Sequence, residues 1–384
     1  MNSVAFKMLV GDRAKYLGIV MGITFASLLI TQQLGIFVGL MARTFGSISD
    51  LGLPDIWVMD PKVQFIDDIK PLQDTELLRV RGVDGVEWAT PLYKGLLKAR
   101  LDSGEFQTCV VLGLDDATLI GGPPQVTVGR LADLRRSDAV IVDEYATTDK
   151  LAKVGPDGRK IPLKVGDTLE LNDHRAIVVG FCRVSRTFQS QPVVYTTYSR
   201  ATTFAPKERK LLSFVLVKAK PGVNVAELCA RIRKTTGLMA LTQKGFEQKT
   251  VDYFMRNTGI PINFGIAVVL GFLVGTAIAG QTFYNFTLDN LRHFGALKAM
   301  GASNGLLLRM ILLQALVVGT IGYGLGVGIA AFIGQAAGKT ELSFLLPWQL
   351  LVVTAVAVIL ICVIASLISI RKVMKLEPAI VFKG

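Results

Sequence analysis

Four long apolar runs constrain the fold of this chain more than any other feature. They cover residues 17–42, 262–286, 306–333 and 348–370, and each has about 20 or more mostly apolar residues, enough to cross a bilayer core of about 30 Å. The whole chain is only 19% charged, whereas about a quarter of the residues in a soluble protein are charged. We therefore predict four transmembrane helices.

The first run also resembles a secretory signal peptide in its position. Its apolar stretch is longer than the 7–15 residues, roughly, of a signal-peptide core. The residues after it, GLMART, contain no pair of small residues for cleavage. We therefore interpret 17–42 as a retained signal anchor.

Basic residues in the short loops predict how the helices are oriented. Ten lysines and arginines fall in 1–16, 287–309 and 371–384, whereas the loop 334–347 has only Lys339. The N-terminal segment 1–16, the segment 287–304 and the tail 371–384 are therefore expected in the cytoplasm. The 43–257 segment and the short loop 334–347 are expected on the periplasmic side of a cell inner membrane.

The large segment 43–257 reads as an α+β domain inserted between the first two transmembrane helices. Strand, helix and strand patterns follow one another near its start and again near its end, so both ends are expected to build one α+β layer. The middle, about 104–205, is β-rich and is predicted to form a second lobe. It includes a short helix expected over VDEYATTDKLA (142–152) and a hairpin that turns at Asn172 and Asp173.

Pairs of glycines four residues apart recur in the apolar runs. This spacing lets transmembrane helices approach closely, although glycine is frequent in membrane helices in any case. Several pairs in three of the four helices favour tight packing, within one chain or between copies. The pairs are Gly18 and Gly22, Gly35 and Gly39, Gly271 and Gly275, Gly322 and Gly326, and Gly324 and Gly328.

The sequence offers no catalytic, cofactor or metal site. It has two histidines, His174 and His293, too few for a two-histidine zinc site in either compartment, and no hydrolase motif. The stretch GQAAGKT (334–340) lacks the spacing of a phosphate-binding loop and lies on the outer face. The basic residues form no aromatic-interleaved patch for nucleic acid. Any ATP and Mg²⁺ would therefore be bound by another chain.

The four cysteines, Cys109, Cys182, Cys229 and Cys362, show no disulfide framework. Three of them lie in the external segment, an odd number, so one bridge there is possible and one cysteine would be left over.

A basic, glycine-containing stretch, TLDNLRHFGALKAMGAS (287–303), lies between the second and third apolar runs. Drawn as a helix, it has an apolar arc interrupted by Lys298, with Leu288, Leu291, Phe294, Gly295 and Ala299. The opposite arc has Arg292, His293 and Met300, and Gly301 is placed to end the helix. An interfacial helix that contacts anionic lipid and a helix that docks onto a cytoplasmic partner both fit these residues.

Together these features resemble the permeases of ABC transporters. One membrane helix, a large external domain, three more helices and the stretch LRHFGALKAMGAS resemble the MacB/FtsX/LolC-type superfamily. ITFASLLITQQLGIFVGLMART (23–44) and RKVMKLEPAIVFKG (371–384) are similar to its DevC-like branch. The resemblance covers the membrane half strongly and the external domain only in the order of its elements.

This resemblance implies that the 287–304 segment is a coupling helix on a cytoplasmic ATPase dimer. The implied interface residues are Leu288, Leu291, Arg292, His293, Phe294, Gly295, Lys298, Met300 and Gly301. It further implies a homodimer of permeases, whose interface we expect at the first two membrane helices. ATP-driven closure of the partner would move the external domains, which is called mechanotransmission, without a wide substrate path.

The expected function is export of an amphiphile such as a lipid or glycolipid, together with a periplasmic adaptor of the membrane-fusion type. An FtsX-like subunit that signals to a periplasmic enzyme without transport is the main alternative. A membrane-bound enzyme is a third hypothesis, which a cluster of titratable residues in the external domain would favour. The residues themselves do not select the substrate.

Overall fold

The computed structural model describes residues 2–11, 13–101, 103–155, 157–206, 212–337 and 342–374. The chain divides into two compact units. Unit 1 consists of 1–40 and 259–384, and unit 2 of 41–258. The end of the predicted tail, from residue 375, and Lys339 of the predicted loop lie outside the described residues.

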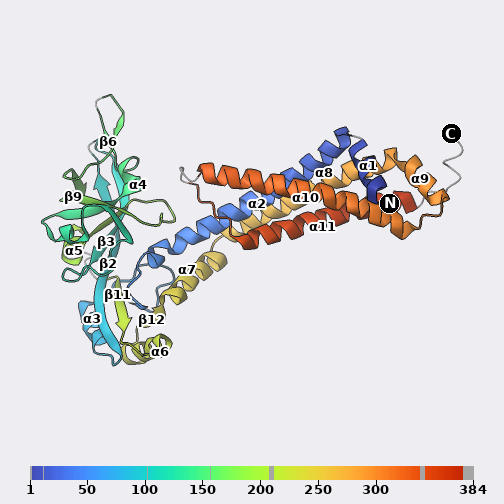
Figure 1. The fold of residues 1–384 in the computed structure, drawn as a ribbon. Helices are drawn as coiled ribbons and strands as arrows, with labels where there is room; N and C mark the ends of the chain where they lie inside the picture. The colour runs from blue at the N-terminus through green and yellow to red at the C-terminus, as the bar shows by residue number, and fades with distance from the viewer. Residues whose placement is uncertain are drawn as a thin grey trace. The chain divides into compact units, whose positions relative to one another are not determined.

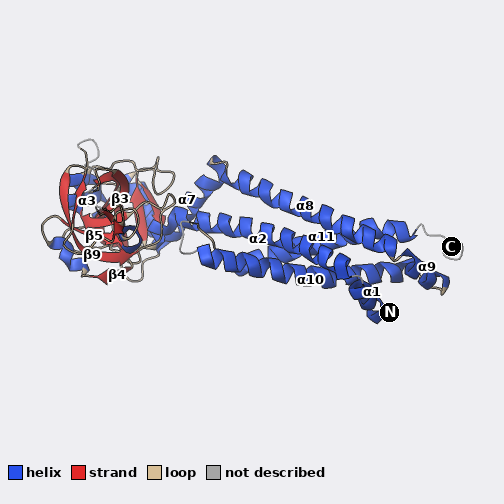
Figure 2. Ribbon diagram, turned by 90° about the horizontal axis from the view of Figure 1, so that it is seen from above, coloured by secondary structure: helices blue, strands red, loops and turns tan. Residues whose placement is uncertain are grey.

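The described residues of unit 1 form helices joined by short connections such as 342–347 (Figure 2). Four of its described helices, α2, α8, α10 and α11, are long and apolar enough to cross a membrane. Helix α2 continues into unit 2. Each predicted apolar run lies inside one of them. The bounds are α1 Asn2–Gly11, α2 Arg13–Ser49, α8 Ile260–Asp289, α9 Leu291–Ala299, α10 Asn304–Ala337 and α11 Trp348–Met374.

The core of unit 1 lies where all four long helices meet. Its fully buried members include Ile23 of α2, Phe283 of α8, Val318 of α10 and Ile361 of α11. Many other apolar side chains of these helices face outward, and in α8 only 17% of the most apolar window is buried. This pattern is the reverse of a soluble bundle and is typical of helices whose outer faces contact lipid.

Unit 2 contains all strands of the described residues and helices α3 to α7 (Figure 1). Its strands are β1 Ile56–Met59, β2 Val86–Arg100, β3 Phe106–Leu114, β4 Gln125–Val128, β5 Ala139–Asp143, β6 Lys153–Val154, β7 Lys160–Ile161, β8 Thr168–Leu171, β9 His174–Arg183, β10 Val193–Thr197, β11 Phe214–Ala219 and β12 Met239–Thr242. Its helices are α3 Asp74–Arg81, α4 Glu144–Thr147, α5 Tyr198–Phe204, α6 Val225–Thr236 and α7 Gln243–Asn257, with a short 3₁₀ turn η1 at Leu131–Arg135.

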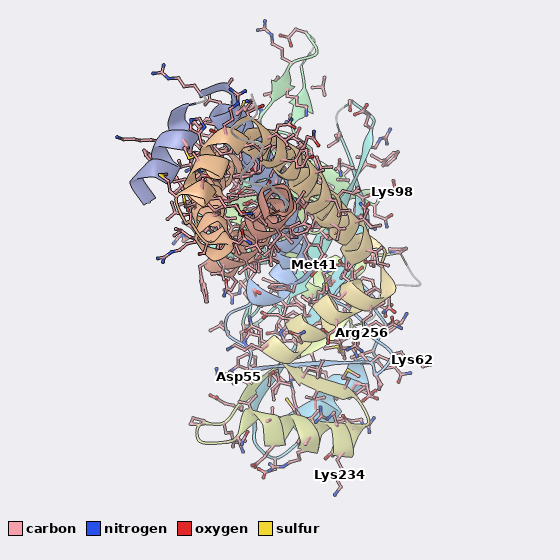
Figure 3. All side chains as sticks on the ribbon, turned by 90° about the vertical axis from the view of Figure 1, so that its right-hand side faces the viewer. Met41, Asp55, Lys62, Lys98, Lys234 and Arg256 are labelled. Carbon is pink, nitrogen blue, oxygen red and sulfur yellow. The ribbon has the colours of Figure 1, made fainter. Side chains whose placement is uncertain are left out.

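The two ends of this domain form one α+β layer, as the sequence predicts. Strands β12, β1, β11 and β2 lie side by side in that order, and all three pairings are antiparallel. Helices α3 and α6 cover the layer through a core that includes Val80 and Ile232. Asp55 accepts hydrogen bonds from Lys218 and from the backbone N–H of Ala219, which fixes the start of β1 beside β11 (Figure 3).

The middle of the domain is a closed barrel of six strands. Going round it, β2 pairs with β3, β3 with β10, β10 with β5, β5 with β9, β9 with β8, and β8 returns to β2. Alternate side chains such as Val111 and Val140 fill the interior. The predicted lobe of about 104–205 corresponds to this barrel. Its first strand, β2, also belongs to the α+β layer and runs from one into the other (Figure 1).

A second core lies outside the barrel wall and includes the last turn of α2. Trp57, Phe214 and Phe246 pack with ring centroids 5.5–5.8 Å apart. Ile48 and Leu51, at and just beyond the end of α2, are buried in the same core. The last turns of α2 are therefore part of the folded external domain and not only of a membrane anchor.

The predicted hairpin is confirmed in detail, whereas two predicted helices differ from those found. Antiparallel β8 and β9 turn at Asn172 and Asp173, whose φ values are 48° and 66°. The predicted helix over 142–152 is confined to α4, because Asp143 is the last residue of β5 and also caps α4. The 287–303 stretch is not one helix, because α8 ends at Asp289, Asn290 is not helical, and α9 begins at Leu291.

Candidate functional site: the α9 segment and its contacts

Helix α9 is a separate short helix with well-defined ends. Asn290 separates α9 from α8, and its side-chain amide donates to the carbonyl oxygen of Phe286 at 2.9 Å. At the other end, Gly301 has φ of 95°. The N–H of Ala302 donates to Leu297 O and that of Gly301 to Lys298 O, both at 3.0 Å. These two bonds form a Schellman motif, which ends α9 and satisfies its last carbonyl groups.

One face of α9 is built into unit 1. Phe294 is fully buried in a core with Leu307 and Met310 of α10 and Ile370 of α11. Gly295 is also buried, and Leu297 packs against the same core. This face fixes the position of α9 on the ends of α10 and α11.

The opposite face of α9 is exposed and has a mixed basic and apolar character. Arg292 and His293 are exposed, and the side chain of Met300 is 75% exposed. Ala299, expected on the apolar arc, is exposed as well, whereas Leu288, Leu291 and Lys298 are half-buried. Of the nine predicted interface residues, the structure thus leaves three side chains fully open and buries Phe294 and Gly295.

Two contacts near α9 involve residues that sequence reasoning did not assign to the site. Lys15, in the first turn of α2, forms an ion pair with Asp289, the last residue of α8. Met8 of α1 packs against the core that holds Phe294, and Leu9 of α1 is fully buried. Lys15 and Asp289 are 274 positions apart, so only their opposite charges at two predicted helix ends hinted at the pair.

Glycines join α2 to α8 closely. A methyl group added to Gly22 would lie 2.6 Å from the side chain of Ile278, and Gly18 faces Thr282. From the other side, Gly271 faces Leu29 and Ile30, and Gly275 lies against Ala26. These four glycines all contribute to the packing of α2 on α8 within one chain.

Four of the remaining six predicted glycines also face α2 or lie on it. Gly322 and Gly326 of α10 approach Ile23 and Ser27, where an added methyl group would be 2.8 and 2.6 Å from the nearest side-chain atom. Gly35 and Gly39 of α2 lie against the 342–345 segment, whose Phe344 ring would be 2.5 Å from a methyl group at Gly35. Gly324 and Gly328, in contrast, have no heavy atom within 4 Å of such a methyl group.

In unit 2, polar contacts hold the last turns of α2. Asp50 accepts hydrogen bonds from the backbone N–H and the hydroxyl of Ser185, both at 2.8 Å. Arg43 donates to the hydroxyl of Ser190 at 3.1 Å. A methyl group at Gly46 would lie 2.7 Å from the Cβ of Ser185. The segment after β9 thus packs closely around α2.

Next to this contact, titratable side chains gather at the ends of β5 and β9. Asp143 is only 5% exposed and caps α4 by accepting from the N–H of Tyr145 at 3.2 Å. Burial raises the pKa of Asp143 to about 6, although the Tyr145 N–H and the charge of Arg186 act in the other direction. Burial also raises the pKa of Asp50, against the effect of its bonds to Ser185.

This cluster has no arrangement for nucleophilic catalysis. Ser185 hydrogen-bonds to a carboxylate, with no histidine beside it, and His174 lies at the β8–β9 turn near the ring of Phe204. All four cysteines are buried and unpaired, and burial raises the pKa of Cys109 to about 12. No group of three or more His, Cys, Asp or Glu among the described residues could hold a metal ion.

Two protein families match the sequence. Residues 16–235 match the MacB-like periplasmic core domain, and residues 265–378 match the FtsX-like permease C-terminal region. The first match covers more than half of the chain, and the second covers α8 to α11, including the α9 segment. Residues 236–264, which contain β12, α7 and the start of α8, separate the two matches.

Curated relatives match over most of the chain. An uncharacterised ABC transporter permease of Mycobacterium tuberculosis, found in two strains, is 24% identical over 324 residues, which are 82% of this chain and 80% of the relative. An uncharacterised ABC transporter permease of Methanocaldococcus jannaschii is 23% identical over 58% of each chain.

Solved structures resemble parts of the chain. The periplasmic region of MacB from Actinobacillus actinomycetemcomitans is 18% identical and has a TM-score of 0.36, covering 55% of this chain and 96% of that one. The extracellular domain of the noncanonic ABC-type transporter YknZ from Gram-positive bacteria is 13% identical, with a TM-score of 0.34 over 49% of this chain and 98% of that one.

Proposed function

The chain belongs to the MacB/FtsX family of ABC transporter permeases, and from this premise we propose that it is the membrane subunit of an exporter that works by mechanotransmission. A separate cytoplasmic ATPase dimer binds and hydrolyses ATP with Mg²⁺, and two copies of the chain act together. The chain itself moves its external domain and carries out no chemical step.

The observation that carries this proposal is the two-sided structure of α9. Its buried side chain, Phe294, is fixed in the core of unit 1, while Arg292, His293 and Met300 are exposed. A helix that only rested on lipid head groups would turn its apolar side chains toward the membrane. Here an apolar side chain, Met300, is 75% exposed beside exposed basic ones, which suits a protein surface with an apolar pocket beside acidic groups.

The apolar helices and the MacB-like domain together indicate a membrane protein with an extracytoplasmic domain. In the proposal both termini and α9 are cytoplasmic and unit 2 is periplasmic. The support is the excess of lysine and arginine on one side of the predicted helices. The N-terminal segment and the α8–α10 connection both contribute to it, with Lys15 and Arg309 as described examples.

The contacts of α9 suggest how its movement reaches the other helices. Phe294 is in contact with α10 and α11 through their shared core. The ion pair of Asp289 with Lys15 joins the end of α8 to the start of α2. Helix α2 then continues without a break to Ser49, whose neighbours are part of the external domain. The proposed path therefore uses α2 as the direct link to unit 2.

The substrate we propose is an amphiphile such as a lipid or glycolipid, delivered with the help of a periplasmic adaptor. The support is the resemblance of residues 23–44 and 371–384 to the DevC-like branch. Export of a labelled amphiphile from vesicles with the assembled complex distinguishes transport from signalling without transport.

A charge-reversal experiment tests the proposed docking surface. The double variant Arg292→Glu and Met300→Glu should fail to co-purify with the ATPase, because it places two negative charges on the exposed face while Phe294 stays buried. Arg309→Glu is the matched control, since Arg309 is also exposed and basic but lies on α10 outside α9. If the double variant keeps the ATPase as well as the control does, this docking surface is wrong.

A further inference from the structure

A narrow apolar groove lies between α10 and α11 in unit 1. Its volume is about 110 Å³, and it is partly open along one side. Small residues create it: Gly319 of α10 faces Cys362 of α11, where a methyl group added to Gly319 would be 2.6 Å from the thiol sulfur. Ala355 leaves space on the α11 side. None of these residues belongs to the α9 segment.

The groove is long and runs parallel to the helices. Its lining on α10 extends from Leu316 to Tyr323, which is about 10 Å at a rise of roughly 1.5 Å per residue. The open side is bordered by apolar side chains, since Leu316 is 39% exposed and Ile359 is 49% exposed. Both helices are among the four that are apolar enough to cross a membrane. The groove thus lies lengthwise within the membrane-spanning part.

The polar groups in the lining already have partners within the protein. The hydroxyl of Thr320 donates to Leu316 O at 2.8 Å, and the hydroxyl of Tyr323 donates to Leu351 O at 3.1 Å. A buried polar group without a partner would favour a polar ligand. Because both hydroxyls are satisfied, the groove favours an apolar occupant.

From this geometry we propose that the groove binds one acyl chain of a membrane phospholipid. An empty space of this size would deprive its lining of dispersion contacts, and an apolar cavity of about 150 Å³ is enough to bind a molecule such as benzene. A helix of a second copy would place its side chains in the groove about 5.4 Å apart, one per turn, and would not fill it continuously. A continuous groove of about 10 Å is filled better by an unbranched chain, which lies across the bilayer in the same direction.

The experiment uses the full-length protein in lipid nanodiscs that contain a phosphatidylcholine with a photoreactive group in the middle of one acyl chain. After illumination, labelled peptides are identified by mass spectrometry. Ala355→Leu fills the groove from the α11 side, and Ala357→Leu is the matched control. Ala357 is also a half-buried alanine of α11, but it does not line the groove.

We expect the lipid to label the 316–323 and 355–362 peptides of the unchanged protein. This labelling should fall at least several-fold in Ala355→Leu and stay the same in Ala357→Leu. Labelling of the exposed α8 residues Ile266 and Leu273 should stay the same in all variants, since bulk lipid contacts them. Thr320→Leu narrows the groove from the α10 side and replaces Ala355→Leu if that variant does not fold.

Two outcomes would overturn the proposal. Equal labelling of the groove in Ala355→Leu and Ala357→Leu would mean that only bulk lipid reaches it. No labelling of the 316–323 and 355–362 peptides in the unchanged protein, while Ile266 and Leu273 of α8 are labelled, would mean that lipid does not occupy the groove. Because the readout does not involve ATP, a negative result here leaves the proposed exporter function untouched.

Discussion

The buried carboxyl group of Asp143 should make unit 2 less stable at neutral pH than in mild acid. The pKa of this group rises from 3.8 to about 6 on folding, because burial disfavours its charged form. Between these two values the folded state binds more protons than the unfolded state, so stability falls as the pH rises from about 4 to about 6. This sign is opposite to that of an ordinary ion-paired carboxylate.

The shift of about two pKa units corresponds to about 3 kcal/mol at roughly 1.4 kcal/mol per unit. Asp143→Asn should therefore stabilise unit 2 by about 1–3 kcal/mol at pH 7.5 and remove most of the loss between pH 4 and 6. The neutral amide keeps the cap, since asparagine accepts the N–H of Tyr145 as well as aspartate does. Some pH dependence should remain, because burial also raises the pKa of the neighbouring Asp50.

Urea unfolding of the detergent-solubilised chain, followed by tryptophan fluorescence, measures this effect. Trp57 is 1% exposed in the core beside the barrel, and a Trp348→Phe background removes the signal from α11. Asp115→Asn is the matched control, since Asp115 also accepts a backbone N–H, that of Thr118, but is only half-buried. If Asp143→Asn lowers stability at pH 7.5, or leaves the pH slope unchanged, desolvation of Asp143 is not the cause.

Three further predictions concern buried contacts. The side chain of Lys94 is 3% exposed and pairs with the carboxylate of Asp67. Asp67→Asn leaves this buried ammonium group without a charged partner, so it should weaken amide exchange protection of the 63–68 segment by about 2–3 kcal/mol. Lys94→Met removes the buried charge as well and should weaken that protection by less than about 1 kcal/mol. Gly326→Leu should lower thermal stability by about 1–3 kcal/mol through overpacking against Ser27, whereas Gly328→Leu, which has open space, should not. Exchanging the charges, Lys15→Asp with Asp289→Lys, should restore ATPase stimulation that either single variant reduces; failure to restore it would exclude a role for the pair.

The sequence predicted those parts of the fold that depend on local patterns. The turn at Asn172 and Asp173 was predictable because both residue types tolerate a positive φ, and the strand before them, TLEL, alternates polar and apolar residues. The long apolar runs predicted the spanning helices for a similar reason, since composition over about 20 residues is a strong signal. The break at Asn290 was not predictable, because the residues around it keep a helical pattern.

Contacts between distant residues were beyond prediction from one sequence. Closure of the barrel depends on Ala99 and Arg100 pairing with Leu171 and Glu170, and nothing in either strand specifies the other. The glycine pairs indicated close packing, but not that α2 is the helix they face. Within the α9 segment, the pattern separated Phe294 from Arg292 and His293, whereas the exposure of Ala299 depends on how the short helix is seated on α10 and α11.

The unbroken course of α2 has a consequence for how the permease tolerates changes in length. The helix has 37 residues, Arg13 to Ser49, and unit 2 begins inside it at Met41. One residue inserted at Leu40 would turn the last turns of α2 by about 100° about the helix axis, relative to its first turns, and shift them by about 1.5 Å. Seven inserted residues, close to two full turns, would almost restore the angle. The number of residues in α2 thus sets the angle about its axis between Gly22, which packs in unit 1, and Gly46, which packs in unit 2.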